Sequence, residues 1–191
     1  MTERKPALMI VDMINDYMDP EGDLYGELLH DIVPNVEQLA TTFRNTDLPV
    51  IFANTSIVTD DQPMVEQWGQ HAVRGTWGER VIDPLTPQES DYVVRKPMYD
   101  AFYDTELDHL LRSLNATEVI ITGVDSHVCI LQTSIGAFNR GYDVTIVKNG
   151  ISTKEQHKHQ FAIEYTESHL GEVRSSADIV ARIEQQCATT N

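Results

Sequence analysis

One cysteine lies where the chain changes from an apolar strand to a helix. Cys129 stands in TGVDSHVCILQT, where the strand breaks at Gly123 and a helix begins near Ser126 or His127. A thiol in the first turn of a helix is close to the positive end of the helix dipole, which lowers its pKa and favours the nucleophilic thiolate. The backbone N–H groups there can also stabilise an oxyanion. The alternative is a buried structural thiol, because cysteine is among the most buried residue types.

Two charged residues stand at the ends of other apolar segments. Asp12 directly follows the apolar run 7–11, and Lys96 stands between Val-Val-Arg and Pro97. A carboxylate there must be solvated, paired or functional, because burying it alone is costly. An ammonium beside a thiol would hold the thiolate in its charged form. A turn role for Asp12 and a solvated position for Lys96 are the alternatives.

The elements that must position these residues follow from the hydrophobic pattern. Continuous apolar runs predict strands, and a 3.6-residue periodicity predicts helices. Their alternation predicts an α/β fold of three layers, an open, mostly parallel six-stranded sheet with Rossmann-like order 3-2-1-4-5-6 and helices on both faces. We expect strands at 7–11, 50–53, 92–94, 118–122, 142–147 and 171–174, and helices at 32–44, 105–114, 127–140, 154–170 and 177–186.

The predicted topology brings the chemical residues together. Ligands bind beyond the carboxyl ends of the strands in an open parallel sheet. Asp12, Lys96 and the segment 123–129 all follow such ends. Residues 54–90 show no strong periodicity, and a loop of that length in a compact domain is usually functional. We therefore expect one site in a single domain that spans residues 1–191.

Composition excludes several classes of function. The formal net charge is −16 and no stripe of Lys and Arg occurs, so we expect no nucleic-acid partner. No apolar run is long enough for a membrane helix, and the N-terminus lacks the features of a signal peptide. A cytoplasmic protein with no membrane partner is therefore expected. Two cysteines are too few for a disulfide framework, and Cys187 lies in a polar tail.

Four sequence blocks resemble those of the isochorismatase-like cysteine hydrolases, which include nicotinamidases and N-carbamoylsarcosine amidase. They occur in the order VDMINDY, HAVRGTWGERV, RKPMYDAFYDTEL and TGVDSHVCILQTSIGAFNRGYDV, and the resemblance covers nearly the whole chain. It implies that Asp12, Lys96 and Cys129 form the catalytic trio. It also implies a cis peptide between Val124 and Asp125, with the N–H groups of Asp125 and Cys129 as the oxyanion hole.

Other positions depart from relatives within this family. Nicotinamidases carry an Asp-x-His pair after the second strand and a further His in the HAVRGT block, and these residues bind zinc. This chain keeps His71 but has no Asp-x-His in NTSIVTDDQP, so we expect no metal and no cofactor. True isochorismatases lack the cysteine, so Cys129 argues against that branch. Asp100 stands where many relatives have a small residue.

These observations predict hydrolysis of a small amide, ureido or related C–N substrate through a thioester on Cys129. The alternatives are a zinc-containing nicotinamidase and a non-catalytic binding protein on the same fold. A small molecule is the expected ligand, and a homo-oligomer, dimer or tetramer, is the expected assembly. The side chains expected to line the substrate pocket are Tyr17, Trp77, Tyr99 and Phe102.

Overall fold

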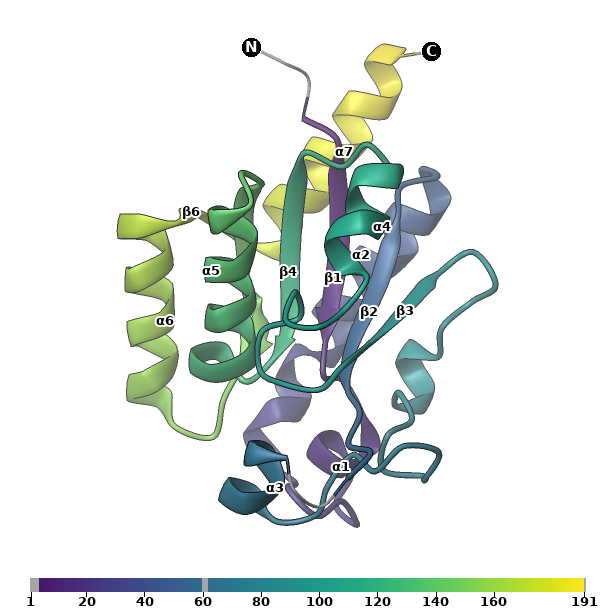
Figure 1. The fold of residues 1–191 in the computed structure, drawn as a ribbon. Coiled ribbons are helices and arrows are strands. Elements are labelled where there is room, and N and C mark those ends of the chain that lie inside the picture. The colour runs from purple at the N-terminus through teal and green to yellow at the C-terminus, as the bar shows by residue number, and fades with distance from the viewer. Residues whose placement is uncertain (1–3, 60–61, 191) are drawn as a thin grey trace.

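The computed structural model describes residues 4–59 and 62–190. A six-stranded sheet forms its centre, and every pair of neighbouring strands is parallel. The strand order is β3-β2-β1-β4-β5-β6, which confirms the predicted topology (Figure 1). The strands are β1 (Pro6–Val11), β2 (Val50–Thr55), β3 (Tyr92–Lys96), β4 (Glu118–Val124), β5 (Asp143–Ser152) and β6 (Gly171–Arg174).

Helices cover both faces of this sheet. On one face α2 (Val33–Asn45) packs beside α7 (Ser176–Thr190). On the other face lie α4 (Leu107–Ser113), α5 (Leu131–Asn139) and α6 (Gln156–His169) (Figure 1). Strand β1 is buried along its whole length between these layers, as its continuous apolar sequence requires.

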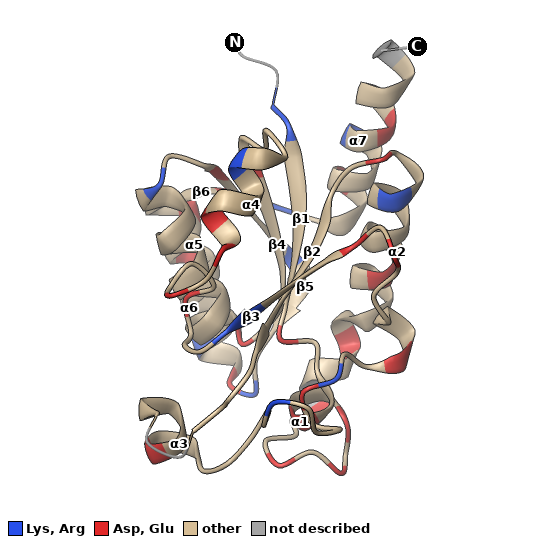
Figure 2. Cartoon of the chain, turned by 45° about the vertical axis from the view of Figure 1, so that its right-hand side comes forward, with Lys and Arg blue, Asp and Glu red and all other residues tan. Residues whose placement is uncertain are grey.

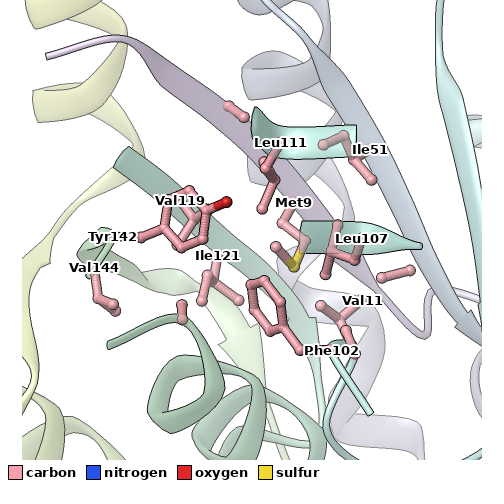
Figure 3. Close-up of a cluster of buried hydrophobic side chains, with 14 of the residues drawn as sticks. Met9, Val11, Ile51, Phe102, Leu107, Leu111, Val119, Ile121, Tyr142 and Val144 are labelled. Atoms are coloured by element: carbon pink, nitrogen blue, oxygen red, sulfur yellow. The ribbon is translucent and has the colours of Figure 1, made fainter. Parts of the chain in front are cut away.

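The two layers enclose two hydrophobic clusters. Side chains of β1 that point to the α4–α5 face, such as Met9 and Val11, pack with Leu107 and Leu111 of α4 (Figure 3). Their neighbours Leu8 and Ile10 point to the other face and join the cluster under α2 and α7. This alternation follows from the two-residue period of a strand, and it fixes the sheet relative to both helical layers.

Several segments differ from the sequence prediction. The stretch 54–90 was expected to be irregular but contains α3 (Pro63–Trp68) and the 3₁₀ turn η2 (Asp83–Leu85). The helix expected at 127–140 is divided into a wide π-helical turn, η3 (Ser126–Ile130), and α5. Strand β5 continues beyond the expected residue 147, because the β4–β5 register shifts and pairing resumes.

Two short elements between β1 and α2 were also missed. Helix α1 (Asn15–Met18) follows β1 directly, and the 3₁₀ helix η1 (Glu27–Ile32) leads into α2. Helix α1 lies beyond the carboxyl ends of the strands, at the bottom of Figure 1. Acidic residues are spread over the helices and the loop after α1 (Figure 2). No helix of the described residues is long and apolar enough to cross a membrane.

Candidate active site

Four neighbouring strands end at one place and bring the predicted residues together. Asp12 follows β1, Thr55 ends β2 and Lys96 ends β3, while β4 leads into the turn that carries Cys129. The order β3-β2-β1-β4 places these ends side by side. This position, where the chain winds in opposite directions from β1, is the switch point at which α/β sheets form ligand sites.

Lys96 links the other members of the group. Its side chain is completely buried, and its Nζ lies 2.8 Å from Asp12 Oδ2. The same nitrogen lies 3.4 Å from Cys129 Sγ and also donates to Thr55 Oγ1 at 2.8 Å. It has a fourth partner in the carbonyl of Met98 at 3.2 Å. Burial would lower the pKa of Lys96, but the charge of Asp12, together with hydrogen bonds to Asp12 and Cys129, reverses this effect and raises it.

Asp12 is held in place by the backbone around it. Its φ is 55°, and its Oδ1 accepts a hydrogen bond from Thr55 N at 2.6 Å. Gly123 packs against the adjacent strand end with φ 110°, and a Cβ at that position would lie 2.0 Å from Val11 O. Glycine is therefore required beside the strand end that carries Asp12.

Cys129 lies in the wide turn that follows β4. The peptide bond between Val124 and Asp125 is cis. The N–H groups of Val128 and Ile130, on either side of Cys129, both donate to the carbonyl of Asp125, at 3.0 and 3.2 Å. The N–H groups expected to form an oxyanion hole, those of Asp125 and Cys129, therefore belong to one tightly bonded turn.

The protonation of the thiol differs from the sequence expectation. We expected the helix terminus to lower the pKa of Cys129, but burial raises it well above its ordinary value. Lys96 acts in the opposite direction, and the Asp12 carboxylate raises the pKa further. A thiol that is only 5% exposed loses more from poor solvation of its anion than it gains from nearby dipoles. The resting group is therefore a neutral thiol beside an ion pair.

A cavity of about 160 Å³ opens at Cys129. Among the residues proposed for the pocket, Tyr17 and Tyr99 line this cavity. Trp77 and Phe102, which were also expected there, are not among the residues that line it. Trp77 is 41% exposed, and its carbonyl accepts hydrogen bonds from Asn15 Nδ2 and Arg80 N. Phe102 is buried in the α4–α5 cluster beside Tyr142, because the turn after β3 directs it into the core (Figure 3).

The connection from β5 to α6 and the first turn of α6 contribute residues that sequence reasoning missed. Lys154, Glu155 and Lys158 line the cavity, together with His127 from η3. Lys154 donates to the carbonyl of Leu24 at 2.6 Å, and Lys158 pairs with Glu155. Two of the five lysines of the chain stand four residues apart here, and this spacing was a signal available in the sequence.

His159 was interpreted as part of a solvated helix face, and the structure corrects this. Its Nδ1 lies 2.9 Å from Ser126 Oγ, in the turn that carries Cys129. His157 is exposed, as expected. The hydrogen bond attaches α6 to η3, which explains why the cavity wall combines these two elements.

The donor groups around His71 do not fit a zinc site. His71 lines the cavity at Cys129. Asn54 begins the segment in which nicotinamidases carry their Asp-x-His pair, but it lines a different cavity, together with Glu79 and Arg95. Ser56 Oγ lies 3.0 Å from Arg74 Nε, which places a fixed positive charge beside the end of β2. Within residues 4–59 and 62–190, no three His, Cys, Asp or Glu side chains are grouped to hold a metal ion.

Comparison with known proteins assigns this arrangement to a family. The family model described as the isochorismatase domain matches residues 6–178, which include the whole cavity. The chain belongs to the isochorismatase family. The isochorismatase family protein YaaI of Bacillus subtilis (strain 168) is 30% identical over 186 residues, which are 95% of this chain and all of that protein.

Solved structures of isochorismatase-family proteins share the fold over nearly their whole length. The N-carbamoylsarcosine amidase of Thermoplasma acidophilum is 32% identical, with a TM-score of 0.83 over 90% of this chain and 96% of that one. The nicotinamidase PncA of Bacillus subtilis is 26% identical, with a TM-score of 0.86 over 90% of this chain and 99% of that one. These similarities support the family assignment that the four sequence blocks implied.

Replacing Asp125 with Asn should stabilise the protein at alkaline pH. Burial raises the pKa of Asp125 to about 6, above the ordinary 3.8, despite opposing effects of Lys154 and Thr153. A folded-state pKa above the unfolded one means that ionisation disfavours the native state, so stability is lost as the pH rises from about 4 to 6. At pH values above 6, this shift of the pKa lowers the free energy of unfolding by about 3 kcal/mol.

We therefore expect Asp125→Asn to raise the melting temperature at pH 8 by several degrees, roughly 2–4 °C per kcal/mol recovered. At pH 4 both proteins carry a neutral side chain, so the gain should nearly disappear. Thermal unfolding of both proteins at the two pH values measures this. An equal change in melting temperature at pH 4 and pH 8 would contradict the proposal that the buried, charged carboxylate of Asp125 destabilises the folded protein.

Proposed function

We propose that this protein is a hydrolase that cleaves a small amide, ureido or related C–N substrate through a thioester on Cys129. The observation that carries this proposal is the position of Lys96 Nζ, which contacts Asp12 Oδ2 at 2.8 Å and Cys129 Sγ at 3.4 Å. A nucleophile, a proton acceptor and a fixed cation thus meet at the cavity. These are the groups that cysteine-based acyl transfer requires.

The first step is the formation of the thioester. Burial keeps the Cys129 thiol protonated, so its proton must move to Asp12 as Sγ attacks the substrate carbonyl. Lys96 remains charged throughout and stabilises the negative charge that moves from Asp12 to sulfur and then to the substrate oxygen. The N–H groups of Asp125 and Cys129 are the proposed donors to that oxygen.

The second half of the reaction restores the enzyme. Asp12 transfers its proton to the departing nitrogen, so ammonia or an amine leaves as the C–N bond breaks. Asp12 then accepts a proton from water, whose oxygen attacks the thioester carbonyl. The C–S bond breaks, the thiol regains its proton, and the carboxylic acid leaves. No residue outside the trio is needed as an acid or base.

The alternatives are a non-catalytic binding protein and a zinc-containing nicotinamidase. The similarity to an N-carbamoylsarcosine amidase and to a nicotinamidase supports hydrolysis of a C–N bond over binding alone. The donor set near His71 favours an enzyme without zinc, because Asn54 faces another cavity and Arg74 lies beside Ser56.

We also propose that the whole chain forms one domain and that this domain assembles as a homo-oligomer. Large apolar side chains at the surface are candidates for an interface between subunits. Among the side chains that the structure describes, those with the largest exposed fractions are Trp68, Tyr103, Phe138, Phe161 and Val58. Trp68 also lines the cavity, where its Nε1 donates to Tyr99 Oη at 2.7 Å.

Ammonia release from a panel of small amides and ureido compounds tests the function. We expect turnover by at least one compound, and we expect it to survive prolonged treatment with a metal chelator. Elemental analysis of the same preparation should find well under one zinc or iron per chain. Activity that is lost on chelation and restored by zinc would favour the nicotinamidase alternative, and no turnover of any compound would favour a binding protein.

A further inference from the structure

Thr55 contacts both partners of the buried ion pair, although sequence reasoning assigned it no role. Its backbone N–H donates to Asp12 Oδ1 at 2.6 Å, and its Oγ1 accepts a hydrogen bond from Lys96 Nζ at 2.8 Å. The residue is completely buried. It is not among the described residues that line the cavity at Cys129. An effect of its hydroxyl on the reaction therefore passes through Lys96 rather than through the substrate.

The sheet topology explains why Thr55 lies between these two charges. Strand β2 runs between β1, which ends before Asp12, and β3, which ends at Lys96. Thr55 is the register partner of Lys96 in the parallel pair of β2 and β3, so the two side chains point to the same face of the sheet. The Lys96 side chain thus crosses the end of β2 on its way to Asp12 and Cys129. The Thr55 hydroxyl lies where this crossing occurs.

The Lys96 ammonium has more contacts than hydrogens. It carries three hydrogens, and four acceptors lie around its Nζ. Thr55 Oγ1 at 2.8 Å and the carbonyl of Met98 at 3.2 Å are uncharged and take no part in the proposed proton transfer. The other two are Asp12 Oδ2 at 2.8 Å and Cys129 Sγ at 3.4 Å, the acceptor and the donor of that proton. When Thr55 and Met98 each receive one hydrogen, a single hydrogen remains for the two reacting groups.

From this count we infer that the Thr55 hydroxyl positions the Lys96 ammonium, so that one N–H is shared between the reacting carboxylate and the thiol. This inference rests on the proposed function, in which Asp12 accepts the thiol proton. As the proton moves from Sγ to Oδ2, the carboxylate becomes neutral and the sulfur becomes the charged acceptor. The shared N–H then turns from Asp12 to the thiolate. The S–H bond breaks, the O–H bond forms, and Lys96 stays protonated.

Loss of this hydroxyl should weaken Asp12 as a base. Valine has the shape of threonine but offers the ammonium no acceptor, so Thr55→Val releases a second N–H. The nearest charged acceptor is Asp12 Oδ2, 2.8 Å from Nζ, and a second hydrogen bond stabilises that carboxylate in its charged form. A carboxylate stabilised in this way accepts the thiol proton less readily. The backbone N–H that holds Asp12 Oδ1 is unchanged, so the variant isolates the hydroxyl.

Alkylation of Cys129 measures this effect without a substrate. The Cys187→Ala protein has Cys129 as its only thiol, and mass spectrometry follows the reaction of this thiol with iodoacetamide at pH 8. One hydrogen bond to a charged group predicts that Thr55→Val reacts about tenfold more slowly in this background. Thr55→Ser keeps the hydroxyl and loses only a methyl group, so its rate should stay within about twofold of the parent rate.

Two comparisons separate positioning from packing. A packing role predicts the opposite order of the two variants, because valine fills the site whereas serine leaves a small cavity. Thr122→Val is the matched control, since Thr122 is also completely buried and its hydroxyl donates to the carbonyl of Met9 at 3.1 Å. This variant loses a buried hydrogen bond away from Lys96 and should keep the parent alkylation rate. Melting temperatures of all three variants check that each is folded.

A double-mutant cycle tests whether Thr55 acts through Lys96. Lys96→Met removes the ammonium and keeps an unbranched side chain, so Thr55→Val should have no further effect on the alkylation rate in that background. If Lys96→Met does not fold, the comparison of valine with serine at position 55 decides alone. An unchanged rate in Thr55→Val, equal losses in Thr55→Val and Thr55→Ser, or additive effects in the cycle would overturn the inference.

These outcomes are distinct from failure of the proposed function. Absence of turnover of every amide and ureido compound by the wild-type protein would refute the hydrolase, whereas the order of alkylation rates would still report on Thr55. With a compound that is hydrolysed, Thr55→Val should lower kcat about tenfold and leave KM nearly unchanged. Turnover together with parent alkylation rates and kcat in Thr55→Val would leave the hydrolase proposal intact and refute only the role of Thr55.

Discussion

Cys129→Ala should lower kcat by at least about a thousandfold with any substrate that the wild-type protein hydrolyses. The residual rate should be that of a pocket that binds and polarises the carbonyl but forms no covalent bond. The substitution removes one sulfur atom at a 5% exposed site and leaves the Lys96–Asp12 ion pair in place. The loss of folding free energy should therefore be small, about 1 kcal/mol.

Cys187→Ala is the matched control for this variant. It removes the other free thiol of the chain, which lies on α7 and does not line the cavity. Steady-state rates of both variants, together with their melting temperatures, separate a chemical role from a loss of folding. A Cys129→Ala protein that is folded and keeps a tenth of the wild-type kcat would exclude the nucleophile assignment.

Asp12→Asn should have the second largest effect and should act almost entirely on kcat. The amide keeps the size of the carboxylate but cannot accept the thiol proton, so we expect kcat to fall by about 10²–10⁴-fold. KM should change by no more than a few fold, because Asp12 is bonded to Lys96 and Thr55 and no binding role is assigned to it. A rise in KM with an unchanged kcat would assign Asp12 to substrate binding.

Loss of the carboxylate also leaves a buried ammonium without its ionic partner. Breaking a buried ion pair on one side costs about 3–5 kcal/mol, so Asp12→Asn should unfold at a lower temperature. Lys96 keeps its hydrogen bonds to Thr55 Oγ1 and the carbonyl of Met98, which offset part of this cost. The kinetic comparison must therefore be made well below the melting temperature, with circular dichroism as the check on folding.

The sheet was predictable because its signals are local. Each central strand is a continuous apolar run, and a strand buried on both faces is expected to have such a sequence. Strand ends follow from the same pattern, so the meeting of Asp12, Lys96 and the Cys129 turn could be expected from topology alone. The distances between these three side chains could not be predicted, because they depend on how far the Lys96 side chain extends across β2.

The errors arise where packing decides between equally plausible positions. Tyr99 and Phe102 stand three residues apart in the same block, yet one lines the cavity and the other is buried in the core. Lys154 reaches the cavity because β5 continues beyond its register shift to Ser152, which hydrophobic periodicity does not reveal. The raised pKa of Cys129 depends on burial, which outweighs the local helix terminus.

The most direct test of the proposed chemistry is mass spectrometry of the protein quenched in acid during turnover, followed by peptide mapping. An activated substrate with a good leaving group makes the thioester form faster than it hydrolyses, so the intermediate accumulates. We expect the acyl mass on the peptide that contains Cys129, and none on the peptide with Cys187. Rapid turnover with no adduct on Cys129, or an adduct on another residue, would contradict a thioester mechanism at this site.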